Sequence, residues 1–304
     1  MNIEEIINSN LNKSDKMRRL FDEGKTRKEV AILLGVGYGF VQNVYAKYNA
    51  NRPLSPEGDF VFNRTFGIEL EIIHNNKSEL RDAIRNRGIA CEIEGYNHTT
   101  RRNWKIVSDA SVVGGYELVS PVLKGENGLA EIKAVSDALI EVGATINKTC
   151  GFHAHFGTQD FKKNISVWRN LYINYATLES DIDSFMPQSR RNNQYCRSLK
   201  VSNWRAKMET AQTLEGLENA VTGRSRYFKL NSQSYWRHGT VEFRQHSGTV
   251  EFEKIKNWLL FCARFIDLSK REKFSEGGDR ALAKLLDSGL ATFYKQRKQK
   301  FERR

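Results

Sequence analysis

A segment near the carboxyl end of the chain, residues 239–249, alternates polar and apolar side chains and then reaches a glycine. Alternation with a period of two is typical of a half-buried β-strand, so Glu242 and Arg244 should share its polar face. Such a pair can hold a metal-bound phosphate, because the carboxylate binds a hard cation and the guanidinium binds a phosphate oxygen. Taken alone, the segment would more often present a surface ion pair.

Two earlier segments carry carboxylates with strand-like patterning. Residues 65–73 place Glu69 and Glu71 on one face, where two like charges repel unless something positive lies between them. A divalent cation would relieve this repulsion, and oxygen ligands suit Mg²⁺ or Mn²⁺; a solvated polar face is the alternative. Residues 115–121 place Glu117 in a short apolar run, where burial of an unpaired charge would be costly.

A fourth segment, residues 150–157, contains His153 and His155 two positions apart, so both imidazoles should face the same way. An H-x-H pair can bind zinc, or it can donate hydrogen bonds to phosphate and substrate groups. Together the four segments hold four carboxylates, two histidines and one arginine. This set predicts a concave sheet whose polar face is an active site.

The order of the motifs resembles the amidoligase family. The chain reads FGIELE, W-x-x-x-x-D-x-S, YELVSPVL, CGFHAHF, YFKLN and GTVEFRQHSGT, over roughly residues 60–270. The resemblance implies an ATP-dependent ligase that joins a carboxylate to an amine through an acyl phosphate, on an amino acid, peptide or protein. It also implies a catalytic core like that of glutamine synthetase. The alternation of strands and helices agrees with this, predicting an α+β fold with helices behind an antiparallel sheet.

The resemblance also implies roles for individual residues. The ligands for Mg²⁺ or Mn²⁺ would be Glu69, Glu71, Glu117 and Glu242. The catalytic residues would be Glu71, His155, Glu242 and Arg244. The groups that bind ATP or its phosphates would be His153, Arg190, Arg191, Asn231 and Arg244. For Arg190 and Arg191 a solvated loop is an equal alternative, and Asn231 could simply cap its strand.

Three residues near these motifs have weaker assignments. Asp109 could bind the incoming amine or form a turn. His246 and Ser247 follow Arg244 and could line the amine or nucleotide pocket. No glycine-rich phosphate loop is found in the sequence, which argues against ordinary P-loop nucleotide hydrolases but not against this type of site.

The pattern of residues 1–50 predicts a separate helical unit of the helix-turn-helix type. Thr26 and Glu29 form a capping box, Gly35 marks a turn, and a recognition helix follows at residues 38–47. Contact with nucleic acid through residues 15–47 is therefore expected, and a three-helix bundle for protein contacts is the alternative. The charge supports nucleic acid only modestly, because residues 1–52 contain nine Lys and Arg against six Asp and Glu.

The remaining boundaries follow from composition. Two of the four prolines fall in residues 51–59, which we expect to form a linker. The catalytic domain should then span residues 60–294, and residues 295–304 should form a basic tail. The net charge of +12 favours polyanionic partners. The four scattered cysteines, with no signal peptide or membrane-spanning run in the sequence, predict a cytoplasmic protein.

Two other functions fit part of the pattern. A metal-dependent hydrolase or nuclease, directed to nucleic acid by the first helices, would also use paired acids and an H-x-H pair. A non-enzymatic DNA-binding sensor is the third interpretation, although seven ionisable groups would be a costly way to build one. Arg244 beside Glu242 and the motif order favour the ligase. A helix-turn-helix joined to a ligase suggests a phage or mobile element as its setting.

Overall fold

The computed structural model describes residues 3–23, 25, 27–51, 60–108, 112–161 and 164–302. Contacts divide the chain into two compact units, Met1–Asp59 and Phe60–Arg304. Three sequence predictions lie outside the described residues: the linker beyond Asn51, the Thr26 half of the capping box, and the roles of Asp109.

The first unit is all helical. Its helices are α1 (Ile3–Asn8), α2 (Lys13–Asp22), α3 (Arg27–Leu33) and α4 (Tyr38–Asn51). They enclose a small core of Ile6, Met17, Leu20, Phe21, Val30, Val41 and Val44. The turn between α3 and α4 contains Gly35 with φ +58°, a conformation that favours glycine. The predicted all-helical segment before the sheet is confirmed.

The second unit is built around a single large sheet, and its mixed α+β class confirms the prediction. The strands are β1 (Thr65–Ile73), β2 (Cys91–Ile93), β3 (Trp104–Val107), β4 (Gly115–Val119), β5 (Leu123–Lys124), β6 (Gly151–Gly157), β7 (Leu230–Asn231) and β8 (Thr240–Ser247). Their order is β2-β3-β4-β1-β6-β8-β7, with β5 beside β1. The pairing of β2 with β3 is parallel, and the other strand pairs are antiparallel.

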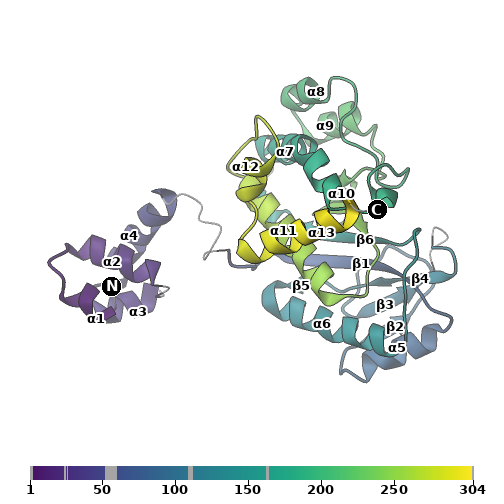
Figure 1. Ribbon diagram of the computed structural model, residues 1–304, viewed down its shortest axis with the longest axis horizontal. Helices are drawn as coiled ribbons and strands as arrows, with labels where there is room; N and C mark the ends of the chain where they lie inside the picture. The colour runs from purple at the N-terminus through teal and green to yellow at the C-terminus, as the bar shows by residue number, and fades with distance from the viewer. Residues whose placement is uncertain are drawn as a thin grey trace. The chain divides into compact units, whose positions relative to one another are not determined.

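The helices of the second unit are α5 (Lys77–Arg85), α6 (Gly125–Glu141), α7 (Ile165–Ser184), α8 (Trp204–Thr210), α9 (Leu214–Val221), α10 (Gln233–His238), α11 (Phe252–Ser269), α12 (Asp279–Ala283) and α13 (Ser288–Glu302), with short 3₁₀ turns η1 (Gln159–Phe161) and η2 (Gln188–Arg190). Several of them, α7 and α11 among them, cover the apolar face of the sheet. Figure 1 shows α5 and α6 side by side against the sheet. Phe243 of β8 packs on Tyr175 of α7 and Phe265 of α11, with ring centroids 5.9 and 6.1 Å apart. The opposite face of β1, β4, β6 and β8 is thereby left for polar side chains.

Several element predictions were wrong in detail. The sequence at residues 105–109 is typical of a segment that leads into a turn, but residues 104–107 form strand β3, a short strand that is buried on both faces and shows no alternation. The sequence over residues 204–221 predicts one helix, but the structure has two, since Thr213 caps α9 by accepting a hydrogen bond from the Gly216 amide. Residues 295–302, expected as a basic tail, continue α13, and the side chain of Arg297 is buried there. Within the described residues, none of the helices has the length and apolar character needed to cross a membrane.

Candidate active site

Strand register brings the ionisable side chains of four strands onto one face. Because side chains of paired antiparallel residues project to the same side, each cross-strand pair forms a contact of polar groups. The pairs are Glu71 with Glu117 (β1 and β4), Glu69 with His153 (β1 and β6) and His155 with Glu242 (β6 and β8).

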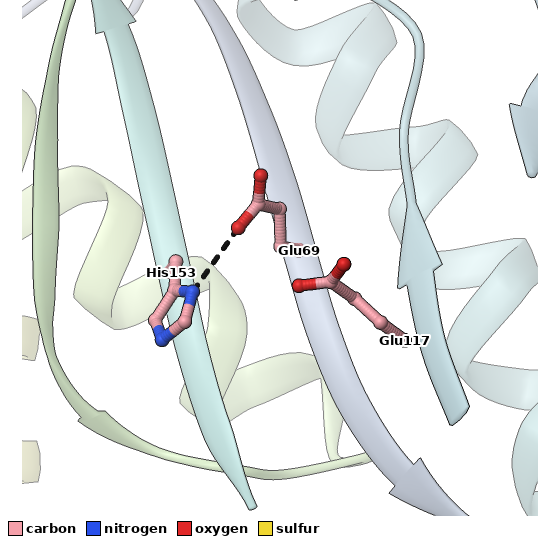
Figure 2. Close-up of side chains that lie close together, drawn as sticks. All are labelled: Glu69, Glu117 and His153. Carbon is pink, nitrogen blue, oxygen red and sulfur yellow. Dashed lines mark hydrogen bonds and ion pairs between the residues drawn. The ribbon is translucent and has the colours of Figure 1, made fainter. Parts of the chain in front are cut away.

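Glu69 lies at the centre of this cluster. Its Oε2 is 3.1 Å from His153 Nδ1, and its Oε1 is 3.5 Å from His155 Nε2. Glu242 Oε1 lies 3.7 Å from His153 Nδ1 and 3.8 Å from His155 Nε2. Figure 2 shows Glu69, Glu117 and His153 extending from three strands over the same face of the sheet. The two imidazoles therefore lie between the carboxylates.

The charges of the cluster compensate one another. Burial alone would raise the pKa of Glu69, but its interactions with His155 and His153 outweigh this and hold that pKa well below its ordinary value. Burial opposes ionisation of Glu242 too, yet Arg244 and the histidines lower its pKa. Burial would lower the pKa of His155, whereas the charges of Glu242 and Glu69 raise it. The site thus favours ionised carboxylates facing a cationic imidazole.

The same side chains form two sets that could hold a metal ion. The sets are Glu69, Glu117 and His153, and Glu69, His155 and Glu242, and within each set the ligand atoms lie within 4.8 Å of one another. His155 Nε2 is fully buried and makes no hydrogen bond, and it could bind a cation once the imidazole has lost its proton, because only the neutral ring offers a lone pair. Mixed oxygen and imidazole donors around a shared carboxylate fit two neighbouring divalent cations. Glu71 is in neither set, because its Oε2 accepts a 2.5 Å hydrogen bond from the Gly151 amide.

Arg244 is fixed beside these carboxylates. Its guanidinium forms a buried ion pair with Glu242 and donates to the Tyr195 carbonyl at 3.3 Å. Asn231 Nδ2 donates to the other oxygen of Glu242 at 2.7 Å, so both oxygens of that carboxylate are oriented. This geometry presents a positioned guanidinium at the edge of the candidate metal sites.

A β-bulge in β8 sets the direction of Arg244. The register between β6 and β8 shifts by one residue, because Phe152 pairs with His246 but Ala154 pairs with Phe243. Two residues of β8, Arg244 and Gln245, therefore occupy the place opposite one residue of β6. Arg190 binds the backbone at this irregularity, donating to the Arg244 carbonyl at 2.5 Å and to the Gln245 carbonyl at 3.3 Å.

The bulge also overturns one prediction. Simple alternation would place His246 on the same face as Arg244, near the pocket. The extra residue instead turns His246 into the core, where it contacts Phe152 and Trp258 with ring centroids 5.4 Å away in each case. Burial lowers its pKa well below the ordinary value. Neither His246 nor Ser247 lines a cavity at this face.

A cavity of about 1280 Å³ opens above the cluster. Four arginines line it: Arg190, Arg226, Arg237 and Arg244. Aromatic side chains accompany them, and the Arg226 guanidinium lies 5.2 Å from the centre of the Tyr227 ring. The cavity therefore combines anionic ligand groups on its floor with guanidinium and aromatic groups on its wall, the features that would bind a metal-complexed, ring-containing polyanion.

The sequence profile of a protein family described as "putative amidoligase enzyme" matches residues 62–266. This range is about two thirds of the chain and includes all four strands of the site. The chain belongs to this amidoligase family. Among curated proteins, no match is found.

The structure brings most of the sequence-predicted site residues into one cavity. Those lining it are Glu69, Glu71, Glu117, His153, His155, Arg190, Asn231, Glu242 and Arg244. Arg191 does not line it, because its side chain turns back and donates to the Met186 carbonyl at 2.8 Å. The functional roles of all these residues stay predictions.

The sequence pattern did not predict part of the cavity wall. The residues concerned are Tyr96, His98, Tyr195, Arg226, Trp236, Arg237 and His238. They come from loops and from the short helix α10, which show no periodicity. The one available signal was Arg226, which directly precedes the aromatic residues Tyr227 and Phe228 of the YFKLN motif. Burial together with neighbouring cations lowers the pKa of both His98 and His238.

Proposed function

We propose that this amidoligase is an ATP-dependent carboxylate–amine ligase that works through an acyl phosphate. The observation that carries the proposal is the arrangement within the large cavity. Its floor holds two candidate metal sites that share Glu69, and Arg244 adjoins them in a buried ion pair with Glu242. A triphosphate complexed with divalent cations needs these two elements side by side.

The ligand sets fit Mg²⁺ or Mn²⁺. Glu69, Glu117 and His153 would hold one ion, and Glu69, His155 and Glu242 the other. When bound, the ions would neutralise negative charge on the triphosphate. The wall of the cavity would bind the rest of the nucleotide, with Arg226 near the phosphates and the rings of Tyr195 and Tyr227 beside the base.

The proposed reaction has two group-transfer steps, and side chains of the cavity would assist each of them. A carboxylate oxygen of the first substrate attacks the γ-phosphorus, and ADP leaves with the electron pair of the broken bond. Arg244 donates hydrogen bonds to the transferred phosphoryl oxygens, held in place by Glu242 and, through that carboxylate, by Asn231. The amine nitrogen then attacks the carbonyl carbon, phosphate leaves, and a carboxylate at the cavity floor accepts the proton that the amine loses.

Release of ADP by the purified full-length protein tests this function. The assay contains Mg²⁺-ATP with and without pooled amino acids, polyamines and peptides. We expect stimulation by substrate, and a loss of at least about 100-fold in Arg244→Lys and Glu242→Gln, because each removes a positioned donor or a ligand. Arg87→Lys, at an exposed ion pair with Glu141, is the matched control and should keep full activity.

Two results would contradict the proposal. ADP release that needs no carboxylate or amine and persists in Glu242→Gln would place the reaction elsewhere. Cleavage of nucleic acid or peptide by the same protein with Mn²⁺ but without ATP would favour the metal-dependent hydrolase instead.

A further inference from the structure

The two residues at the bulge of β8 have different surroundings. Arg244 lines the large cavity, whereas the side chain of Gln245 is fully buried and reaches helix α7. Gln245 Oε1 accepts a 2.5 Å hydrogen bond from the Tyr175 hydroxyl, and its Nε2 donates to Asp183 Oδ1. Both ends of this amide are therefore bonded to the same helix, at residues about two turns apart.

Asp183 in turn belongs to a buried ionic cluster. Lys229, the residue before β7, is 1% exposed. Its ammonium donates to Asp183 Oδ1 at 2.8 Å, to Asp183 Oδ2 at 2.9 Å and to Glu179 Oε1 at 3.2 Å, so its three protons are used. The second oxygen of Glu179 accepts a 2.9 Å hydrogen bond from the Leu199 amide. One lysine thus fixes two carboxylates that lie about one turn apart on α7.

The backbone of Lys229 is bonded to Arg244 itself. The Arg244 amide donates to the Lys229 carbonyl at 2.9 Å, which agrees with the register that pairs Leu230 with Phe243. The Lys229 amide donates to the Arg197 carbonyl, also at 2.9 Å. Lys229 therefore joins the carboxylates of α7, through its side chain, to the backbone of Arg244, through its carbonyl.

Stability alone is a poor reason for this cluster. Charges that are removed from water lose hydration, and their mutual attraction seldom stabilises a fold more than well-packed apolar side chains would. Here one ammonium faces two carboxylates. Burial raises the pKa of Asp183, although the hydrogen bonds from Lys229 and Gln245 oppose this rise. What the cluster supplies beyond apolar packing is direction, because hydrogen bonds depend on angle and hydrophobic contacts do not.

Direction matters especially at a bulge. If the extra residue moved by one position along β8, neighbouring side chains would exchange faces, and Arg244 would turn away from the cavity. Gln245 could not make the corresponding turn without losing its hydrogen bonds to Tyr175 and Asp183. The contacts of the Gln245 side chain therefore select the register in which the guanidinium of Arg244 adjoins Glu242.

We propose that Lys229, Asp183 and Gln245 form a clamp that positions Arg244 for phosphoryl transfer. None of the three lines the large cavity, so they act through Arg244 and not on a substrate. Lys229 fixes Asp183, Asp183 orients Gln245, and Gln245 holds the bulge. The catalytic part of this role depends on the ligase function proposed above, whereas the effect of the clamp on the geometry of β8 does not.

Two full-length variants release the clamp at different points. Lys229→Met leaves two buried carboxylates without their shared cation. The double variant Tyr175→Phe/Gln245→Leu keeps the ionic cluster and replaces only the bridge to the bulge; because both partners become apolar, its cost in stability should be small. Asp287→Asn is the matched control. It weakens an ion pair with Arg264, and its carboxylate is 28% exposed, close to the 24% of the clamp carboxylate.

Hydrogen exchange measured by mass spectrometry reads the geometry of β8 without any substrate. In both clamp variants we expect peptides covering residues 240–248 to exchange at least about tenfold faster, while peptides of β1 and β4 keep their protection. Asp287→Asn should exchange like wild type. Unchanged protection of β8 in Tyr175→Phe/Gln245→Leu would overturn the proposal. So would an equal increase across the whole sheet, because the cluster would then support the fold in general.

A double-mutant cycle with Arg244→Lys tests whether the clamp acts through that guanidinium. Tyr175→Phe/Gln245→Leu alone should lower kcat for substrate-stimulated ADP release at least about tenfold and leave the KM for ATP nearly unchanged, because Arg244 stabilises the phosphoryl group during its transfer. In the Arg244→Lys background the same change should have little further effect, since the positioned group is already gone.

The outcomes separate this proposal from the ligase function. An equal fold-loss of kcat in both backgrounds would mean that the clamp acts independently of Arg244, and would overturn the proposal. If wild-type protein releases no ADP while the exchange result holds, the ligase proposal fails and the clamp on β8 stands.

Discussion

At the scale of the residue, the dominant fact is the gathering of four glutamates around two histidines and an arginine on one face. Burial penalises each charged group, and like charges add to this penalty. Imidazoles and Arg244 outweigh this penalty at Glu69 and Glu242, but His155 Nε2 is left without a hydrogen bond. A structural core would gain more from apolar residues at these positions. The arrangement is consistent with a site that stabilises bound cations rather than its own fold.

Removal of one ligand should therefore weaken metal-dependent stabilisation. Mn²⁺ at about 100 times its Kd would add about 2.7 kcal/mol to the free energy of unfolding, a rise in Tm of roughly 5 °C for a domain of this size. In Glu117→Gln we expect less than half of that rise, measured by differential scanning fluorimetry with and without Mn²⁺. Glu141→Gln, on an exposed part of α6, is the control and should respond like wild type. An undiminished response in Glu117→Gln would exclude this residue as a ligand.

The residue scale is also where the sequence was most informative. A period of two places Glu242 beside Arg244 and Glu69 beside His153, because the four strands containing the motifs happen to be neighbours. The sequence could not indicate that Glu71 binds the Gly151 amide, since such a contact depends on where β6 begins. It could not place His246 either, because a one-residue bulge reverses the alternation beyond Arg244.

At the scale of the element, η2 secures the bulge of β8. Arg190 is buried and donates to the carbonyls of Arg244 and Gln245, while it also borders the large cavity. The position of Arg244 thus depends on a helix that lies over 50 residues earlier in the chain. Loops carry most of what the sequence pattern did not predict. The loop at residues 94–103, for example, is held by the ammonium of Lys105, which donates to Asn97 O, Asn97 Oδ1 and Thr99 O.

Arg190→Met should consequently destabilise the fold as well as the site. Two buried carbonyl groups would lose a donor, at about 1–3 kcal/mol each, so we expect a loss of roughly 2–5 kcal/mol in the free energy of unfolding. Urea denaturation measures it, with the neighbouring Arg191→Met as control, since Arg191 makes one bond to Met186 within its own loop. If Arg190 serves only to bind phosphate, Arg190→Met will unfold like wild type and lose only nucleotide affinity.

A second link between elements should respond to acid. Asp160 of η1 accepts hydrogen bonds from Arg64, just before β1, and from Lys270, just after α11. Burial would raise the pKa of Asp160, but these partners hold it at about 2, below the value of about 3.9 in an unfolded chain. The native state therefore gains stability from this carboxylate above about pH 4, and loses it as the pH falls toward 2.

Asp160→Asn should remove that part of the pH dependence. We expect the free energy of unfolding of wild type to fall more steeply than that of Asp160→Asn between pH 4 and 2, measured by denaturant titration at fixed ionic strength. The difference should be on the order of 1 kcal/mol or less, because the Asp160 side chain is 39% exposed and solvent screens it. Asp137→Asn, at an exposed helix pair, is the control. Parallel curves for wild type and Asp160→Asn would contradict the assignment.

At the scale of the whole molecule, the chain has two cores with no residue in common. One core extends from Phe62 to Tyr294 around the sheet, and the other from Ile6 to Val44 among the first four helices. The family match and all residues of the candidate site lie in the second unit. The first unit instead presents exposed side chains at the beginning of α4, among them Tyr38, Phe40, Gln42 and Asn43. Amide side chains of this type can read adenine in the major groove.

The two units should therefore separate by function when the chain is shortened. We expect residues 60–304 to keep the Tm and ADP release of the second unit, because no group of its core or site is removed. Fluorescence anisotropy with labelled duplex DNA should show binding by the full chain, and its loss both in the shortened chain and in the full-length double variant Gln42→Ala/Asn43→Ala. Binding that survives in residues 60–304 would assign nucleic-acid contact to the second unit. No binding by the full chain, even at low salt where phosphate contacts are strongest, would instead favour a protein partner for the first four helices.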